Sequence, residues 1–96
     1  MTVDQILKQK IRDSELWISR TEEEYPYKRD IKKRIELTNW VLENMKNHDI
    51  KICSLIESKM NEIILKIKKT HSIIQYDKLH GELRILDWIH HQVYLN

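Results

Sequence analysis

The chain has 96 residues, with 17 Lys and Arg against 15 Asp and Glu, and a formal net charge of +2. One Gly, one Pro and one Cys, with no Phe and no Ala, exclude a turn-dense all-β chain, a disulfide scaffold and a Cys-based zinc knuckle. There is no apolar run of about 18 residues, and the N-terminus lacks the apolar region of a signal peptide. We therefore expect one cytoplasmic domain, residues 1–96, without a membrane span.

The first predicted helix spans residues 2–24. Thr2 and Gln5 have the spacing of a capping box, in which a hydroxyl and a side-chain amide satisfy free backbone N–H groups. Apolar residues then recur with a period of 3.6, and Lys10 interrupts them with a side chain long enough to carry its charge back to water. The helix should end before Pro26, because proline disfavours helical backbone in the residue that precedes it.

The second predicted helix, residues 26–47, carries large apolar residues on two faces. Its main face consists of Tyr27, Ile31, Ile35, Thr38, Leu42 and Met45. Leu37 and Trp40 lie well away from that face. A helix of this kind is either packed on both sides or presents one side to a partner.

Two further helices are predicted at residues 50–70 and 73–95. Asp49 is a suitable N-cap for the first of them, and Ser72 with Gln75 has capping-box spacing before the other. Since no Pro or Gly enforces a break between the two segments, one long kinked helix is the alternative.

The fourth predicted helix repeats the apolar pattern of the second at a constant offset. Ile31, Ile35, Leu37, Trp40, Val41 and Met45 correspond to Leu79, Leu83, Ile85, Trp88, Ile89 and Val93. Ile85 and Trp88 therefore lie off the main face, as Leu37 and Trp40 do. The first and third predicted helices do not match at this offset. Either a duplication or apolar periodicity alone would explain the agreement between the second and fourth predicted helices.

These patterns predict an all-α fold, an antiparallel bundle of three to four helices. A chain of this length has a modest core, and self-association, with a dimer favoured, would bury further apolar surface. Trp is enriched among the residues that dominate protein interfaces. The off-face residues are therefore the candidate partner-binding set: Leu37, Trp40, Ile85 and Trp88.

The strongest charge cluster lies at the start of the second predicted helix and is the candidate site for an anion or nucleic acid. Its cations are Lys28, Arg29, Lys32, Lys33 and Arg34, with Tyr25 and Tyr27 available for stacking. The cations spread around the helix, Asp30 lies among them, and no helix-turn-helix turn precedes them. Docking against the acidic residues Glu22–Glu24 is the alternative role.

Histidines and acids on the fourth predicted helix form one polar stripe: Asp77, His80, Arg84, Asp87 and His91. Arg84 in its middle would repel a cation, so we expect a solvated, ion-paired face without a metal site. His90 lies among apolar residues, where it either finds a structural hydrogen-bond partner or acts as a pH-sensitive interface residue. No catalytic or cofactor-binding motif is present, so we expect no enzyme activity, no catalytic residue and no cofactor.

We therefore expect a non-enzymatic module that binds another protein through apolar helix faces. The Ile/Lys/Asn-rich composition and small size are similar to those of accessory proteins of phages and mobile elements, including inhibitors of host defence such as anti-CRISPR proteins. That similarity is one of size and composition, without a shared motif. The alternatives are a nucleic-acid-binding or regulatory module that uses residues 28–34, and an oligomeric protein that holds a small anionic ligand between subunits.

Overall fold

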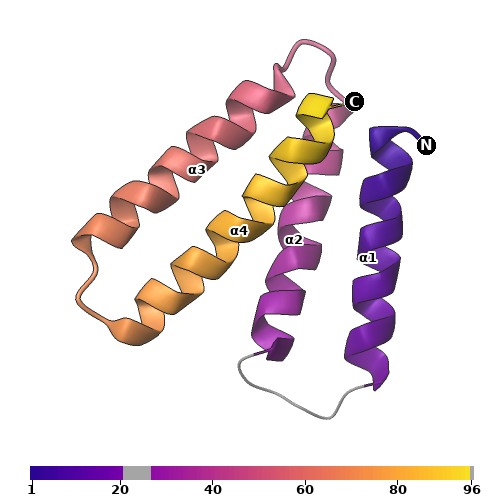
Figure 1. Ribbon diagram of the computed structural model, residues 1–96. Helices are drawn as coiled ribbons and strands as arrows, with labels where there is room; N and C mark the ends of the chain where they lie inside the picture. Colours follow the sequence, from indigo (N-terminus) through magenta and orange to yellow (C-terminus); the bar gives the residue numbers. More distant parts are fainter. Residues whose placement is uncertain (21–26, 96) are drawn as a thin grey trace.

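The structure is a computed structural model that describes residues 1–20 and 27–95. Within this part of the chain the helices are α1 (Val3–Arg20), α2 (Tyr27–Met45), α3 (Ile52–Lys69) and α4 (Ile73–Leu95). α1 and α2 form one antiparallel hairpin and α3 and α4 form a second, as Figure 1 shows. The predicted all-α bundle of three to four helices is confirmed, with four in the described residues, while the predicted end of the first helix at residue 24 lies outside them. No described helix is long and apolar enough to cross a membrane.

Side-chain caps fix the starts of α1 and α4. The N–H of Thr2 donates to Oε1 of Gln5 at 3.1 Å, and the N–H of Gln5 donates to Oγ1 of Thr2 at 3.2 Å, which confirms the predicted capping box. At α4 the N–H of Gln75 donates to Oγ of Ser72 at 3.2 Å. Each bond satisfies a backbone donor that has no partner inside its own helix.

α3 starts without the predicted Asp49 cap. Its N-cap is Lys51, which has extended backbone and no side-chain hydrogen bond to the helix. The side-chain oxygen of Asn47 accepts the N–H of Asp49 at 3.0 Å, a local bond that closes the connecting turn. The Asp49 prediction is therefore wrong, because that residue is held in the turn and not at the helix start.

The break between α3 and α4 is made without Pro or Gly. Thr70 has extended backbone, with φ −83° and ψ 144°, and its hydroxyl oxygen accepts the N–H of Ser72 at 3.3 Å. A threonine side chain that bonds a nearby N–H in this way favours a turn over a continuing helix. Two separate helices, and not one kinked helix, are thus confirmed.

All four helices contribute to one hydrophobic core. Its buried residues are Leu7, Leu37, Val41, Ile56, Ile63, Leu79, Leu86 and Ile89. Two hydroxyls are buried with them: Oγ of Ser14 donates to the carbonyl oxygen of Lys10 at 2.8 Å, and Oγ1 of Thr38 donates to that of Arg34 at 2.6 Å. Both hydroxyls are satisfied within their own helices, so they add no unpaired polar group to the core.

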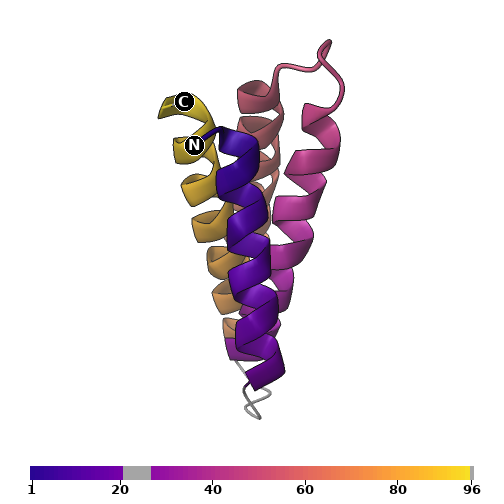
Figure 2. The same ribbon diagram turned by 90° about the vertical axis from the view of Figure 1, so that its right-hand side faces the viewer.

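The two hairpins are related by a pseudo-two-fold axis that runs roughly along the helices. α2 contacts α1, α4 and α3, and α4 makes the equivalent contacts with α3, α2 and α1, whereas the described parts of α1 and α3 do not touch. Figure 2 shows α1 and α3 at the front and back of the bundle, with α2 and α4 at its sides. α2 and α4 run in the same direction (Figure 1), so the bundle is antiparallel within each hairpin and parallel at its central pair.

The residue patterns of the helices follow this symmetry over most of the described chain. The offset that aligns Trp40 with Trp88 relates α2 to α4, and an offset longer by a single position relates α1 to α3, which pairs Lys10 with Lys59. At the offset that aligns α2 with α4, the residues of α1 and α3 are out of register by one position, so their similarity is not seen. Some counterparts are also buried alike, as Val41 and Ile89 are both 0% exposed.

The bundle is flattened. It measures 37 × 35 × 19 Å and has a radius of gyration of 14.0 Å, against about 12.5 Å for a typical domain of this length. Its accessible surface is 6797 Å², against roughly 5,900 Å² for a monomer of this mass. More of the chain therefore faces solvent than is usual for its size.

Candidate functional site

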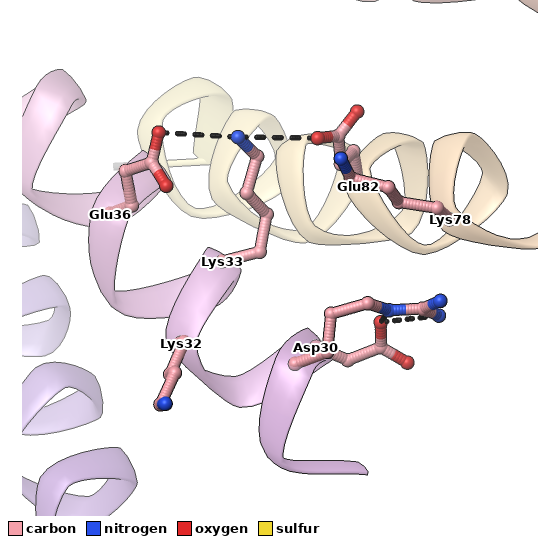
Figure 3. A pocket seen from close by; sticks show the side chains of 7 residues that line it. Asp30, Lys32, Lys33, Glu36, Lys78 and Glu82 are labelled. Atoms are coloured by element: carbon pink, nitrogen blue, oxygen red, sulfur yellow. Dashed lines mark hydrogen bonds and ion pairs between the residues drawn. The ribbon is translucent and has the colours of Figure 1, made fainter. Parts of the chain in front are cut away.

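The predicted anion cluster faces carboxylates of α4. The N-terminal halves of α2 and α4 border a hollow of about 380 Å³, shown in Figure 3. There a guanidinium nitrogen of Arg29 lies 2.9 Å from Asp30 and 3.3 Å from Asp77 of α4. Arg29 therefore forms an ion pair between the two hairpins.

Lys33 is held between two carboxylates. Its Nζ lies 3.1 Å from Glu36 and 3.2 Å from Glu82 of α4, and Figure 3 shows the side chain pointing between them. Partial burial disfavours the charged ammonium, but hydrogen bonds to Glu36 and Glu82 and their negative charges more than offset it, so the pKa of Lys33 lies above its ordinary value of 10.5. Lys33 thus joins α2 to α4 as a fixed positive charge.

The raised pKa of Lys33 predicts a pH dependence on the alkaline side. Folding favours the protonated ammonium, so this contribution to stability is complete below about pH 10.5 and is lost as the pH rises through the higher folded-state value. We expect Lys33→Met to lower the free energy of unfolding by roughly 1 kcal/mol near neutral pH. Between about pH 9.5 and about pH 11.5 this variant should lose less stability than the wild type.

Urea unfolding at each pH measures this effect. The control is Lys46→Met, because Lys46 pairs with Glu43 at 3.0 Å on the open surface and both side chains are exposed. It should follow the wild-type pH profile. Superimposable profiles for all three proteins would contradict the role given to Lys33.

The remaining members of the cluster do not form one site. Lys32 lines the same hollow but points away from the ion pairs (Figure 3), and Lys28 makes an interaction of its own. Arg34 lines a different groove. Tyr25 lies outside the described residues, and Tyr27 is the first residue of α2. The structure therefore divides the predicted anion site between two places.

The four predicted partner-binding residues face other helices. Leu37 is 5% exposed and belongs to the core, so it offers a partner no surface. Trp40, Ile85 and Trp88 are partly buried and pack against that core. The second apolar face of α2 is turned towards α3, and that of α4 towards α1. Packing on both sides, one of the two alternatives for these helices, accounts for all four positions within a single chain.

Two grooves of similar construction flank the central helices. The Trp40 groove, between α2, α3 and α4, has a volume of about 260 Å³ and is lined by Lys33, Glu36, Leu37, Trp40, Lys59, Ile63, Lys66 and Glu82. The Trp88 groove, between α1, α2 and α4, has a volume of about 330 Å³ and is lined by Lys10, Asp30, Arg34, Gly81, Arg84, Ile85 and Trp88. The pseudo-two-fold axis exchanges them, since Trp40 corresponds to Trp88 and Lys59 to Lys10.

Three large apolar side chains at the start of α4 face solvent. Ile73 is 86% exposed, Ile74 67% and Tyr76 49%. Ile73 and Tyr76 also border a hollow at the α3–α4 turn, together with Thr70 and His71. We name Ile73, Ile74 and Tyr76 the α4 entry patch.

The α4 entry patch is a site that the sequence analysis missed. Periodicity places residues 73–95 in one helix, and apolar residues in such a helix are assigned to the core by default. In the structure, residues 73–78 are all exposed, and Leu79 is the first core position of α4. The sequence feature that could have identified the patch is the adjacent pair Ile73 and Ile74, which lies before the regular apolar stripe of α4.

His90 forms a structural contact with α3, whereas Nε2 of His80 is buried without a hydrogen-bond partner among the described residues. Nε2 of His90 lies 2.9 Å from Oε1 of Glu57 on α3, so its partner is a neighbouring side chain, and its ring stacks on Tyr94 at 6.2 Å. Within residues 1–20 and 27–95, no group of three or more His, Cys, Asp or Glu side chains is placed to hold a metal ion.

Comparisons with known proteins place this chain in no family. No family model matches the sequence, and no curated protein or solved structure matches it at a significant level. The functional argument therefore rests on the surfaces and grooves described above.

Proposed function

We propose that this protein is a non-enzymatic module that binds another protein through the α4 entry patch. The observation that carries the proposal is the joint exposure of Ile73, Ile74 and Tyr76 on a chain of which 33% is charged. Large apolar side chains gathered on a charged surface mark interaction sites in soluble proteins. Tyrosine is also enriched among the residues that contribute most to protein–protein affinity.

The ion pairs of α2 weigh against the nucleic-acid alternative. Arg29 and Lys33 already contact Asp77 and Glu82 of α4. Nucleic-acid affinity depends on cations that can replace the counterions of a phosphate backbone. A phosphate would therefore have to displace two carboxylates that also join the hairpins.

A second copy of the chain is included among the partners. The flattened bundle exposes more surface than a typical monomer of its mass, and a symmetric dimer is the commonest way in which small proteins cover such surface. Burial of the α4 entry patch between two copies would remove the same apolar side chains from water. The test below separates this arrangement from a different partner.

The test uses the full chain as a tagged bait in a source-cell lysate, with and without nuclease. Three baits are compared: the wild type, the double variant Ile73→Asp/Ile74→Asp, and the control Leu95→Asp. Both variants add charge at exposed positions, Leu95 being 64% exposed at the other end of α4. Asp in the first turn of a helix also suits the helix dipole, so the double variant should fold.

We expect the wild type and the control to retain one protein in near-stoichiometric amounts in both lysates, and the double variant to lose it. Where the partner is a second copy, sedimentation of the purified protein should give dimers for the wild type and the control and monomers for the double variant. Retention that disappears with nuclease would assign binding to nucleic acid. Equal retention by the double variant would remove the α4 entry patch from the site.

A further inference from the structure

Cationic side chains from three helices converge on the Trp88 groove. They are Lys10 of α1, Arg34 of α2 and Arg84 of α4. Nζ of Lys10 lies 5.1 Å from the centre of the Trp88 ring. Neither arginine forms an ion pair with any residue that the structure describes. The groove therefore holds a concentration of positive charge beside an aromatic wall.

The counterpart groove neutralises part of its charge, because two carboxylates stand among its three lysines, Lys33, Lys59 and Lys66. In the Trp40 groove, Lys33 is held by Glu36 and Glu82 at 3.1 and 3.2 Å. In the alignment of α2 with α4, Glu36 corresponds to Arg84 and Glu82 corresponds to Arg34. The two grooves therefore share one construction, but the carboxylates of the first are replaced by guanidinium groups in the second.

Gly81 leaves the Trp88 groove open. It corresponds to Lys33, whose side chain lines the Trp40 groove. Glycine inside a helix is unfavourable compared with alanine, yet a Cβ at Gly81 would meet Oδ1 of Asp30 at 3.4 Å, an ordinary contact. Packing within the chain therefore does not require a glycine here. Asp30, the one carboxylate in the lining, already contacts Arg29 at 2.9 Å.

We propose that the Trp88 groove binds an acidic segment of the partner protein, an inference that rests on the proposed protein-binding function and adds the chemistry of the partner. The guanidinium groups of Arg34 and Arg84 can each donate two N–H bonds to a carboxylate. Ile85 and Trp88 provide apolar contact for a neighbouring side chain of the same segment. Carboxylates and apolar side chains that alternate along a short segment match both halves of the groove.

Other anions fit the groove less well. A small molecule is usually held with most of its surface buried, whereas Arg84 is exposed and the groove opens to solvent beside it. A nucleic-acid strand needs cations along a continuous track. On the adjacent surface, Arg29 and Lys33 are engaged by Asp77 and Glu82, which interrupts such a track.

The test is a titration of the labelled full chain with acetyl-Glu-Leu-Glu-Leu-amide, followed through the indole N–H signals in nuclear magnetic resonance spectra. The three tryptophans report separately: Trp88 from the groove, Trp40 from its counterpart and Trp17 from the exposed surface. We expect a saturable shift of the Trp88 signal alone. The neutral peptide acetyl-Gln-Leu-Gln-Leu-amide should bind about tenfold more weakly or worse.

Arg84→Glu gives the groove the charge of its counterpart Glu36 and should weaken the acidic peptide by about tenfold or more. The matched control is Arg12→Glu, an exposed arginine of α1 that bonds only Gln9 among the described residues. It makes the same charge change and should leave the affinity as it is. Because both positions are exposed, neither variant should unfold the protein.

Several results would overturn the inference. They are equal shifts at Trp40 and Trp88, unchanged affinity in Arg84→Glu, and a Trp88 shift with inorganic phosphate as large as that with the peptide. Failure here and failure of the proposed function are distinguishable. Capture that depends on the α4 entry patch, with no peptide binding at Trp88, would overturn this inference alone. Peptide binding at Trp88 with unaltered capture by Ile73→Asp/Ile74→Asp would overturn only the role of that patch.

Discussion

We expect Leu86→Ala to lower the free energy of unfolding by about 3 kcal/mol. Leu86 is 0% exposed in α4, which, like α2, contacts all three other helices. Truncation of a buried leucine loses its transfer free energy and leaves a cavity, which together amount to roughly 2–5 kcal/mol. Domains of this size are stable by only about 5–15 kcal/mol, so the midpoint of thermal unfolding should fall by roughly 15 °C.

Leu65→Ala is the matched control for this prediction. Leu65 is 55% exposed on α3, so the same chemical change should alter the free energy of unfolding by less than about 0.5 kcal/mol. Urea unfolding, followed by circular dichroism and by tryptophan fluorescence, measures both variants. A loss below about 1 kcal/mol for Leu86→Ala would contradict a core shared by four helices.

Helix limits are predictable from this sequence because they depend on contacts within one turn. Thr2 with Gln5 and Ser72 with Gln75 have the same close spacing, and the bonds that start α1 and α4 form between them. The error at α3 is also local. The side chain of Asn47 accepts the N–H of the residue expected to cap the helix, and spacing alone does not rank polar side chains that compete within one turn.

The charged site is less predictable because its partners come from another helix. Arg29 meets Asp77, and Lys33 meets Glu82. A reading of α2 and its neighbours in sequence finds Asp30 among the cations but not the two carboxylates of α4. Only the packing of α2 against α4 brings these groups together, and that packing depends on the whole bundle.

Corresponding positions of the two central helices carry opposite charges where these helices meet. Near a two-fold axis, identical hairpins would place like residues opposite each other, and equal charges would repel. In this chain Arg29 and Asp77 are counterparts in the alignment of α2 with α4, and they attract at 3.3 Å. Glu36 and Arg84 are likewise counterparts of opposite charge, and each lines one of the two equivalent grooves. These opposite charges stabilise the centre of the bundle and leave one groove cationic.

Two of the three tryptophans lie at equivalent positions of the two hairpins and have a structural role, which the third does not share. Trp40 and Trp88 are partly buried and pack against the core, whereas Trp17 is 41% exposed. We expect Trp40→Ala and Trp88→Ala each to lower the free energy of unfolding by about 2–3 kcal/mol, below the roughly 3–5 kcal/mol of a fully buried aromatic residue. Trp17→Ala should lower it by less than about 1 kcal/mol.

Trp88→Ala should be the more damaging of the two core variants. Nζ of Lys10 lies 5.1 Å from the centre of the Trp88 ring, and a cation–π contact adds about 0.5–1 kcal/mol at a partly exposed site. No described cation covers Trp40 in this way.

Urea unfolding followed by far-UV circular dichroism measures all three variants. Wild-type midpoints for Trp40→Ala and Trp88→Ala would make these side chains a docking surface and not part of the fold. Equal losses of unfolding free energy in all three variants would contradict the assignment of Trp40 and Trp88, but not Trp17, to the packed fold.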